Sequence, residues 1–512
     1  MPVLLLPAAR ALCMSSDAST FPLRGPLLGG AGGVGLQEQA SAGDEQARAA
    51  TRRTLALGAL ALLSIVAGCA LIVVVSADRP TFPPTHAHFF PGWLAGPLGG
   101  LWPGFPYGSD AVRYLFSFSL LAMYAGYLLG LRWVPRLSAR WAIATVVVVH
   151  VLLFLAPPLA LTDIFNYVNY GRMEVVHHLN PYTSTPIVEP HNDPSFDLSN
   201  WHHLLSPYGP TFTLITFAIV PLGVAASFWA IKLLLMLASL GTIWLVWKCA
   251  RLLGREPVQA IVFVGLNPVV LVWGLGGDHN DFIMMFLIVL GFYLLLRGRE
   301  SESSLAWDVG AGAAFVAAAT VKASGVVLLP IVLAGLIYSP RRLLQSAAGM
   351  IAAGALLAAA SVMAFGLHLP DLSTQSRLVT TLSPSNLLGL ALGSGGATAT
   401  LLHLLSGVLA ASVLAACVMA WRKRDSLTPA GWASVALLLT LSWVLPWYVL
   451  WVLPMAALSR SRALRTTALV FGVFFVLAWA PLANSTLSSL GFHPERTALG
   501  KLHQRYVKEL LN

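Results

Sequence analysis

LALGALALLSIVAGCALIVVVSA (residues 55–77) is a run of 23 residues without a charged side chain. A helix needs about 20 apolar residues to cross the roughly 30 Å hydrocarbon core of a bilayer, so this run is long enough to span a membrane. Similar runs recur along the chain at 112–132, 141–161, 225–250, 258–275, 282–297, 309–322, 326–338, 345–365, 399–420, 431–446, 447–459 and 466–483. We therefore expect an all-α polytopic membrane protein with about 13 transmembrane helices.

The composition of the chain agrees with this expectation. Of its 512 residues, 57% are hydrophobic and 10% are charged, whereas soluble proteins carry about 25% charged residues. The formal net charge is +10, but the basic residues form short clusters between apolar runs rather than one basic surface. We expect no nucleic-acid partner. The four cysteines are scattered without ligand spacing and predict neither a disulfide framework nor a cysteine-bound metal.

The basic residues set the expected orientation, because Lys and Arg are retained on the cytoplasmic side. Threading the runs with the N-terminus inside places most of the 31 basic residues there. We divide the chain into a disordered cytoplasmic tail (1–53), a transmembrane domain (54–483) and a C-terminal tail (484–512) outside. The short apolar segment 210–223 is expected to be a re-entrant half-helix.

The same orientation collects the polar segments on the extracytoplasmic side. The longest, 162–210, has the aromatic, His and acidic content of a surface loop with short amphipathic helices. GGDHND (276–281), Lys322, the loop 368–386 and the PWY sequence at 446–448 fall on the same side. These segments together predict the lining of one cavity.

Asp163 is the first candidate for chemistry, because it follows an apolar run where that run leaves the membrane. A carboxylate at this boundary could act as general base toward an acceptor hydroxyl. It also has the spacing of an N-cap for the helix IFNYVNYGRMEVVHH (164–178). The two roles are compatible.

The GGDHND turn is the second candidate. Its glycines allow backbone and ligand to approach closely, and Asp278, His279 and Asp281 offer acid–base or metal-ligand groups. The alternative is a tight turn in which Asp281 caps the next helix. One His and two Asp are too small a ligand set to predict a metal, so we expect no metal and no cofactor.

Two lysines are candidates for binding a phosphate. Lys322 separates two apolar runs and either snorkels to the interface or faces a cavity as a point charge. Lys232 lies about 10 Å into an apolar helix, where a cation is unfavourable unless its surroundings are polar. Trp447 and Tyr448 are either belt residues at the membrane boundary or stacking surfaces for a substrate.

The order of these motifs resembles a known family. A long apolar helix ending in Asp163 is followed by Tyr167 with Gly171-Arg172, by NPY (180–182), SPYGP (206–210), GGDHND, Lys322 and PWYVLW (446–451). This pattern is similar to the polyprenol-phosphate-mannose-dependent mannosyltransferases of actinobacteria, of the α-1,6-mannopyranosyltransferase kind, within the GT-C superfamily. The resemblance covers residues 55–483, and the order of the motifs is more specific than any one of them.

The resemblance implies a GT-C-like fold and a membrane glycosyltransferase of the bacterial plasma membrane with its active site on the extracytoplasmic face. The donor would be a polyprenyl-phosphate sugar, here mannose, and the acceptor a glycan or glycolipid at the membrane lipid surface. Asp163 would be the catalytic base of an inverting displacement, and Lys322, Arg172 and His279 would stabilise charge on the departing phosphate. The other residues expected to contact substrate are Lys232, Asp278, Asp281, Tyr167, Tyr208, Trp447 and Tyr448. One departure is that the neighbours of Asp163 are Thr162 and Ile164, where many superfamily members carry a second acidic residue.

Two other classes remain as alternatives. A secondary transporter would place ionisable residues near the bilayer midplane and would show two repeated halves, but only Lys232 lies at depth and no internal repeat is evident. A lipid-linked polysaccharide polymerase or ligase would carry its long external loop nearer the C-terminal half. The residues alone leave the sugar open between mannose and a pentose such as arabinose.

Overall fold

The computed structural model describes residues 32–77, 91–102, 109–159 and 163–511, and these residues form helices, turns and irregular segments without a strand. The expected all-α class is therefore confirmed for this part of the chain. The chain divides into two compact units, Met1–Arg53 and Thr54–Asn512. In the first unit, residues 32–53 are helical and belong to α1 (Gly32–Ser76). We had expected an irregular tail, but residues 37–50 are rich in Ala, Gln and Glu, which are strong helix formers. The expected tail at 1–31 lies outside the described residues.

Seven helices among the described residues are long and apolar enough to cross a membrane, by length and composition. They are Arg48–Ser76 of α1, Asp110–Arg136 from α3 (Ser109–Trp133) and η2 (Val134–Arg136), α7 (Val224–Leu252), α9 (Asp281–Glu300), α12 (Pro340–Phe365), α15 (Ala399–Lys423) and α18 (Arg462–Trp479). Shorter apolar helices are α4 (Ala139–Leu155), α6 with η4 (Pro210–Ile219, Val220–Leu222), α10 (Leu305–Val321), η6 with α11 (Ala323–Val327, Leu328–Leu336), α16 (Leu427–Thr440) and η7 with α17 (Pro446–Trp451, Leu453–Leu458). Many long apolar helices indicate an integral, multi-pass membrane protein, and the count of 13 crossings stays a prediction.

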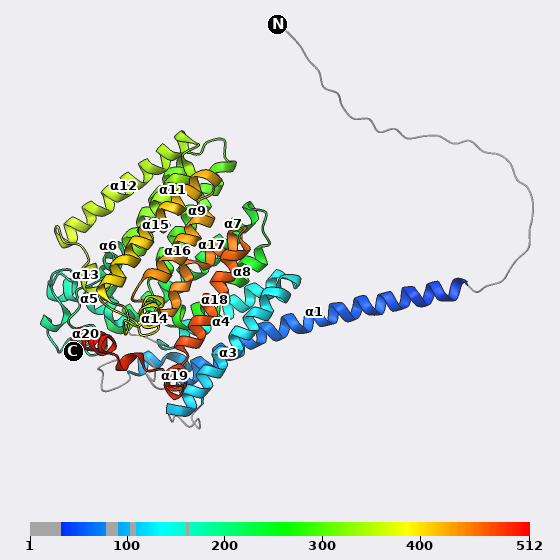
Figure 1. Ribbon diagram of the computed structural model, residues 1–512, viewed down its shortest axis with the longest axis horizontal. Helices are drawn as coiled ribbons and strands as arrows, with labels where there is room; N and C mark the ends of the chain where they lie inside the picture. The colour runs from blue at the N-terminus through cyan, green and yellow to red at the C-terminus, as the bar shows by residue number, and fades with distance from the viewer. Residues whose placement is uncertain (1–31, 78–90, 103–108, 160–162, 512) are drawn as a thin grey trace, which may run out of the picture. The chain divides into compact units, whose positions relative to one another are not determined.

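The remaining elements are short. They are α2 (Gly92–Ala95), η1 (Gly96–Leu98), α5 (Asp163–His177), η3 (Pro186–Val188), α8 (Pro257–Gly265), η5 (Val270–Leu275), α13 (Leu372–Ser376), α14 (Pro384–Ala391), α19 (Ala483–Ser489), η8 (Pro494–Arg496) and α20 (Ala498–Leu511). Figure 1 shows α5, α13, α14 and α20 gathered near one end of the helical bundle.

The apolar run 258–275 is not one helix. It consists of α8 and the π-helical η5, separated by Asn267-Pro268. The residue before a proline is biased away from the helical region, and Asn267 Oδ1 accepts the backbone N–H groups of Val269 and Val270 at 3.0 and 3.3 Å. The side chain thus satisfies two N–H groups at the start of the second segment.

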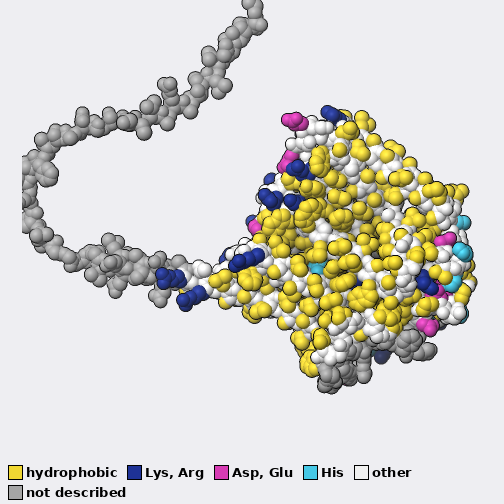
Figure 2. Space-filling model, turned by 180° about the vertical axis from the view of Figure 1, so that it is seen from behind, with side chains coloured by type: hydrophobic (Ala, Val, Ile, Leu, Met, Phe, Trp, Pro, Cys, Tyr) yellow, Lys and Arg dark blue, Asp and Glu magenta, His cyan; other side chains and the backbone are white. Residues whose placement is uncertain are grey.

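The outer surface of the second unit suits a lipid environment. Leu356 and Met363 of α12 are 71% and 82% exposed, and Leu414 of α15 is 66% exposed. In Figure 2, the visible face carries a broad hydrophobic surface, with most Lys and Arg side chains toward one end and most His side chains at the other. This separation is the pattern expected of a bundle whose two ends face different sides of a membrane.

The large polar loop forms a folded layer at the end of the bundle. Asp193 accepts hydrogen bonds from Arg172 Nε and Nη2 at 2.9 and 2.8 Å and lies 2.7 Å from His177 Nε2. Burial alone would raise the pKa of Asp193, but the bonds from Arg172, Ser195 and His177 outweigh it and hold the pKa well below its usual range. The loop also contacts α20, whose Leu510 carbonyl accepts the backbone N–H of His203 at 3.0 Å.

Candidate active site

Four segments distant in sequence meet at one place. Asp163 is the first residue of α5, and GGDHND connects η5 to α9. Lys322 lies between α10 and η6, and PWYVLW forms η7. Each candidate therefore lies where a helix begins or ends, so its polar group reaches the end of the bundle rather than the lipid.

Asp163 is held by a histidine. Its Oδ2 lies 2.9 Å from Nδ1 of His279, and 20% of the Asp163 side chain is exposed. The His279 ring is fully buried and stacks on Trp447, with ring centroids 3.4 Å apart and an angle of 7° between the planes. Stacking fixes the plane of the imidazole, and the hydrogen bond fixes one carboxylate oxygen. The Asp163 side chain also lines the cavity described below.

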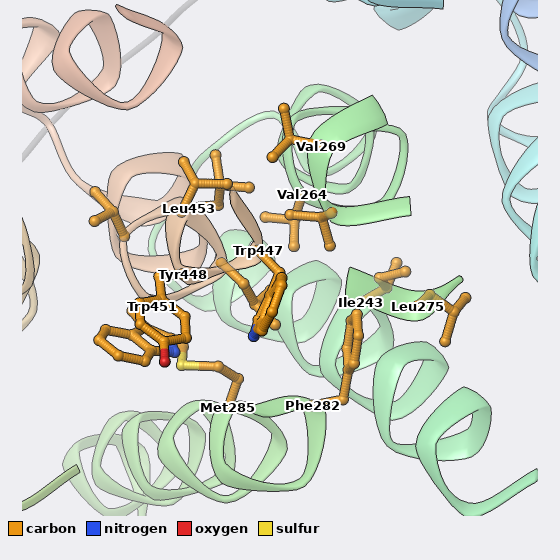
Figure 3. Close-up of a cluster of buried hydrophobic side chains, with 14 of the residues drawn as sticks. Ile243, Val264, Val269, Leu275, Phe282, Met285, Trp447, Tyr448, Trp451 and Leu453 are labelled. Atoms are coloured by element: carbon orange, nitrogen blue, oxygen red, sulfur yellow. The ribbon is translucent and has the colours of Figure 1, made fainter. Parts of the chain in front are cut away.

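Asp281 organises a second group of residues. Its carboxylate accepts N–H groups from Lys322 Nζ at 2.8 Å, Trp447 Nε1 at 3.1 Å and Trp451 Nε1 at 2.6 Å. Lys322 Nζ also lies 4.8 Å from the ring centroid of Tyr448. These contacts orient the ammonium group, and the Lys322 side chain remains 19% exposed. Figure 3 shows the three aromatic side chains of η7 packed beside Met285 and Phe282 of α9.

Close backbone approach explains two of the glycines. A Cβ on Gly277 would lie 2.5 Å from Nε2 of His279, so a side chain there would displace the imidazole. A Cβ on Gly209, in SPYGP, would lie 2.1 Å from the carbonyl oxygen of Thr320, two residues before Lys322. The Gly209 N–H donates to the Val321 carbonyl at 3.1 Å. SPYGP therefore lies directly against the chain that carries the lysine.

Two tyrosines connect the loop to the GGDHND turn. The hydroxyl of Tyr167 accepts the backbone N–H of Asn280 at 3.2 Å. Its ring packs edge-to-face on Tyr208, with centroids 4.7 Å apart. Tyr167 is buried, whereas Tyr208 lines the cavity.

A cavity of about 430 Å³ opens in front of these residues. Its polar side includes Asp163, Tyr208, Lys322 and Tyr448. The rest of the lining is largely apolar and includes Leu372, Leu378, Leu437, Leu441, Leu445, Trp443, Trp479, Val507 and Leu511. A carboxylate and an ammonium group thus share a cavity with an aliphatic wall, which is a setting for an amphiphilic ligand with an anionic group.

Three of the expected contact residues lie elsewhere. Lys232 is buried and bonds to the Ala156 carbonyl at 2.7 Å and to Asp278 Oδ2 at 3.3 Å, so both charges of this ion pair are used inside the protein. Asp278 has a φ of 58° at the tip of the turn. Arg172 is engaged by Asp193 in the loop. None of these three lines the cavity, and sequence spacing gives no means of locating their partners. Four further expected contact residues do not line it either but contact residues that do, namely Tyr167, His279, Asp281 and Trp447.

The structure also adds residues that the sequence analysis did not assign to the site. Trp451 donates to Asp281, Tyr170 lines the cavity, and Val507 and Leu511 of α20 close its apolar side. Trp447 and Trp451 are four residues apart. If PWYVLW is taken to be helical, this spacing predicts that both indoles lie on the same face. No sequence motif indicates that α20 lies beside this cavity. Within the described residues, no group of three or more His, Cys, Asp or Glu side chains could hold a metal ion.

Comparison with known proteins gives two family matches. A model of the "alpha-(1->6)-mannopyranosyltransferase, N-terminal domain" family matches residues 47–338, and a model of the "MptB C-terminal domain" matches residues 380–500. Similar curated proteins include alpha-(1->6)-mannopyranosyltransferase A of Mycobacterium tuberculosis, 29% identical over 64% of this chain and 67% of that protein. A probable alpha-(1->6)-mannopyranosyltransferase of Mycolicibacterium smegmatis is 27% identical over 71% of this chain and 72% of that protein. No solved structure matches the chain significantly.

Proposed function

The chain belongs to the alpha-(1->6)-mannopyranosyltransferase family, and from this premise we propose that it moves mannose from a polyprenyl-phosphate donor to a glycan or glycolipid acceptor outside the cytoplasm. The family membership confirms the resemblance read from the motifs, and it makes the protein a mannosyltransferase. Donor, acceptor, sidedness and the GT-C mechanism belong to the proposal.

The observation that carries the proposal is the shared cavity of Asp163 and Lys322. Transfer from a lipid-linked sugar phosphate needs a base near the acceptor hydroxyl, a cation near the phosphate and an apolar surface for the lipid. Asp163, Lys322 and the leucine-rich wall have these three properties and line the same space. A nucleotide sugar has no lipid chain that would contact the apolar part of the cavity.

The proposed reaction is a single inverting displacement. Asp163 accepts the proton of the acceptor 6-hydroxyl while the hydroxyl oxygen forms a bond to the anomeric carbon of the donor mannose. The bond from that carbon to the phosphate oxygen breaks, and the polyprenyl phosphate leaves with the electron pair. The Lys322 ammonium group stabilises the charge that builds up on the phosphate. Inversion of a β-linked donor gives the α-linkage that the family name describes.

His279 and Asp281 act as positioning residues in this scheme. His279 is buried behind Asp163, so it orients the carboxylate rather than binding the phosphate directly. Asp281 holds Lys322 while the two indole N–H groups satisfy the rest of its carboxylate. The remaining N–H bonds of Lys322 stay available for a phosphate oxygen.

The test is mannosyl transfer by membranes that contain the wild-type chain or Asp163→Asn, supplied with radiolabelled polyprenyl-phosphate mannose and candidate acceptors. We expect Asp163→Asn to reduce transfer by about 100-fold or more, in the range attributed to general-base catalysis. Glu174→Gln is the matched control, since it alters a carboxylate of the same helix that does not line the cavity. Full transfer by a correctly inserted Asp163→Asn variant would remove this residue from the base role. Absence of transfer from every polyprenyl-phosphate sugar by the wild type would refute the donor class.

A further inference from the structure

A second cavity, of about 540 Å³, adjoins the first. The two cavities share four lining residues, namely Trp443, Trp479, Val507 and Leu511. A molecule bound in the second cavity would therefore be separated from a molecule in the first cavity only by these shared side chains. The volume is within the usual range for ligand sites of about 300–1,000 Å³.

The lining of the second cavity is mainly apolar, but it carries a larger share of polar groups than the lining of the first. It includes His503, Gln504 and Lys508 of α20 and Asn484 of α19. None of these four side chains forms a hydrogen bond or ion pair with another residue in the described part of the chain, so their donors and acceptors are free for a ligand. Burial lowers the pKa of His503, so at neutral pH its ring offers one donor and one acceptor.

The spacing within α20 explains this arrangement. Residues 500, 503, 504, 507, 508 and 511 line the second cavity and recur every three or four positions, which places them on one face of the helix. His503, Gln504 and Lys508 supply its polar groups, and Val507 and Leu511 line both cavities. The same helix therefore borders both cavities, and its polar side chains line only the second.

α20 is fastened to the protein by three contacts. Tyr506 Oη donates to the Thr374 carbonyl at 3.2 Å, and Thr497 Oγ1 donates to the Gly395 carbonyl at 2.7 Å. The third is the bond from the His203 N–H to the Leu510 carbonyl. The polar face toward the cavity is thus part of a fixed wall.

We propose that the second cavity binds the acceptor as a neutral, mannose-containing oligosaccharide, and that its terminal 6-hydroxyl reaches Asp163 past Trp443 and Trp479. This proposal rests on the proposed function. Free amide, imidazole and ammonium groups can bond to sugar hydroxyls, and the two indoles give flat apolar surfaces with a polar edge for the sugar rings. The leucine-rich lining of the first cavity suits the lipid of the donor, whereas the second cavity adds the polar side chains of α20 and Asn484 beside the two indoles.

The test uses the purified full-length protein in detergent and an α-(1→6)-linked mannotetraose as the acceptor probe. Its binding is measured by calorimetry without donor, and its KM is measured in the transfer assay. The double variant His503→Ala/Gln504→Ala should weaken binding and raise the acceptor KM about tenfold or more, and leave the donor KM within about twofold. Arg505→Ala is the matched control, because Arg505 is exposed on α20 and does not line the cavity. Lys508→Gln, at an exposed position, gives a milder second variant with an expected effect of about threefold.

The outcomes separate the two proposals. Suppose that the wild type transfers mannose and that the double variant and Lys508→Gln both keep the wild-type acceptor affinity. This result would overturn the acceptor site and leave the proposed function intact. Binding of mannotetraose that these variants weaken, without any transfer from the donor, would support the site and overturn the function. A wild-type protein that neither binds mannotetraose nor transfers mannose would refute both. Thermal unfolding of each variant identifies any that fail to fold, and Lys508→Gln then decides.

Discussion

His279 is the residue on which the geometry of the proposed base depends. It combines one hydrogen bond to Asp163 with a stacked contact to Trp447, so a substitution can remove one and keep the other. His279→Phe keeps a flat ring and loses Nδ1. We expect kcat to fall by about 10- to 100-fold with the donor KM nearly unchanged, since a small misplacement of a reacting group has effects of this size.

A conservative variant distinguishes positioning from packing. The amide nitrogen of His279→Asn can occupy the place of Nδ1, and this variant should recover part of the lost kcat although it lacks the ring. Steady-state kinetics with the labelled donor measures both variants. An equal or greater loss in His279→Asn than in His279→Phe would mean that packing, and not the bond to Asp163, is what matters.

Glu189 gives the protein a pH-dependent stability. Burial, with a smaller contribution from the nearby Asp193, outweighs the hydrogen bond from Asn169 and raises the pKa of Glu189 to about 7. A raised carboxyl pKa means that the folded protein binds more protons than the unfolded chain between the ordinary pKa of about 4.5 and about 7. The contribution of Glu189 protonation to the free energy of unfolding is fully present below pH 4.5. It is lost as the pH rises through 7 and is absent at higher pH.

Glu189→Gln removes the ionisation and keeps the shape of the side chain. At pH 8 the variant should unfold about 2 °C above the wild type, since about 1 kcal/mol corresponds to a shift of a few degrees. At pH 5 the two midpoints should lie close together. Thermal unfolding of detergent-purified protein at both pH values measures this, and a gap that widens toward acid would show that the sign is wrong.

At the scale of the elements, long apolar helices were predictable and broken ones were not. The runs 345–365 and 399–420 lie within α12 and α15, because hydropathy and length suffice for a continuous span. The run 258–275 is interrupted at Asn267 by side-chain hydrogen bonds that hydropathy does not register. In the candidate site, the motifs predicted that Asp163, Lys322 and Tyr448 share a cavity. They could not predict that Lys232 and Asp278 form a buried pair, because pairing across helices leaves no periodic signal.

Gly209 tests whether the contact between SPYGP and the lysine-bearing segment matters. An added Cβ would meet the Thr320 carbonyl at 2.1 Å, so Gly209→Ala must move either α6 or the chain before Lys322. We expect kcat/KM to fall by about tenfold or more. Gly407→Ala on α15 is the control, since a Cβ there meets no atom within 4 Å. Unchanged transfer by a folded Gly209→Ala variant would show that Lys322 tolerates the displacement.

At the scale of the whole molecule, the second unit has a chemical polarity along the bundle. Helix α5, which begins at Asp163, lies with α20 near one end of the bundle (Figure 1), and in Figure 2 most visible His side chains lie at one end and most visible Lys and Arg side chains toward the other. A lipid-linked donor could reach this site only from within the bilayer or from the side on which the site opens. The orientation of the bundle therefore decides which compartment supplies the acceptor.

Cysteine labelling in intact cells tests that orientation. In a chain whose four native cysteines are replaced, Asn192→Cys and Glu302→Cys each introduce one thiol at an exposed position in loops expected on opposite sides. With the basic clusters retained in the cytoplasm, an impermeant thiol reagent should modify Asn192→Cys and spare Glu302→Cys until the cells are permeabilised. Protection of Asn192→Cys together with labelling of Glu302→Cys would invert the bundle, and would put the site in reach of cytosolic substrates instead.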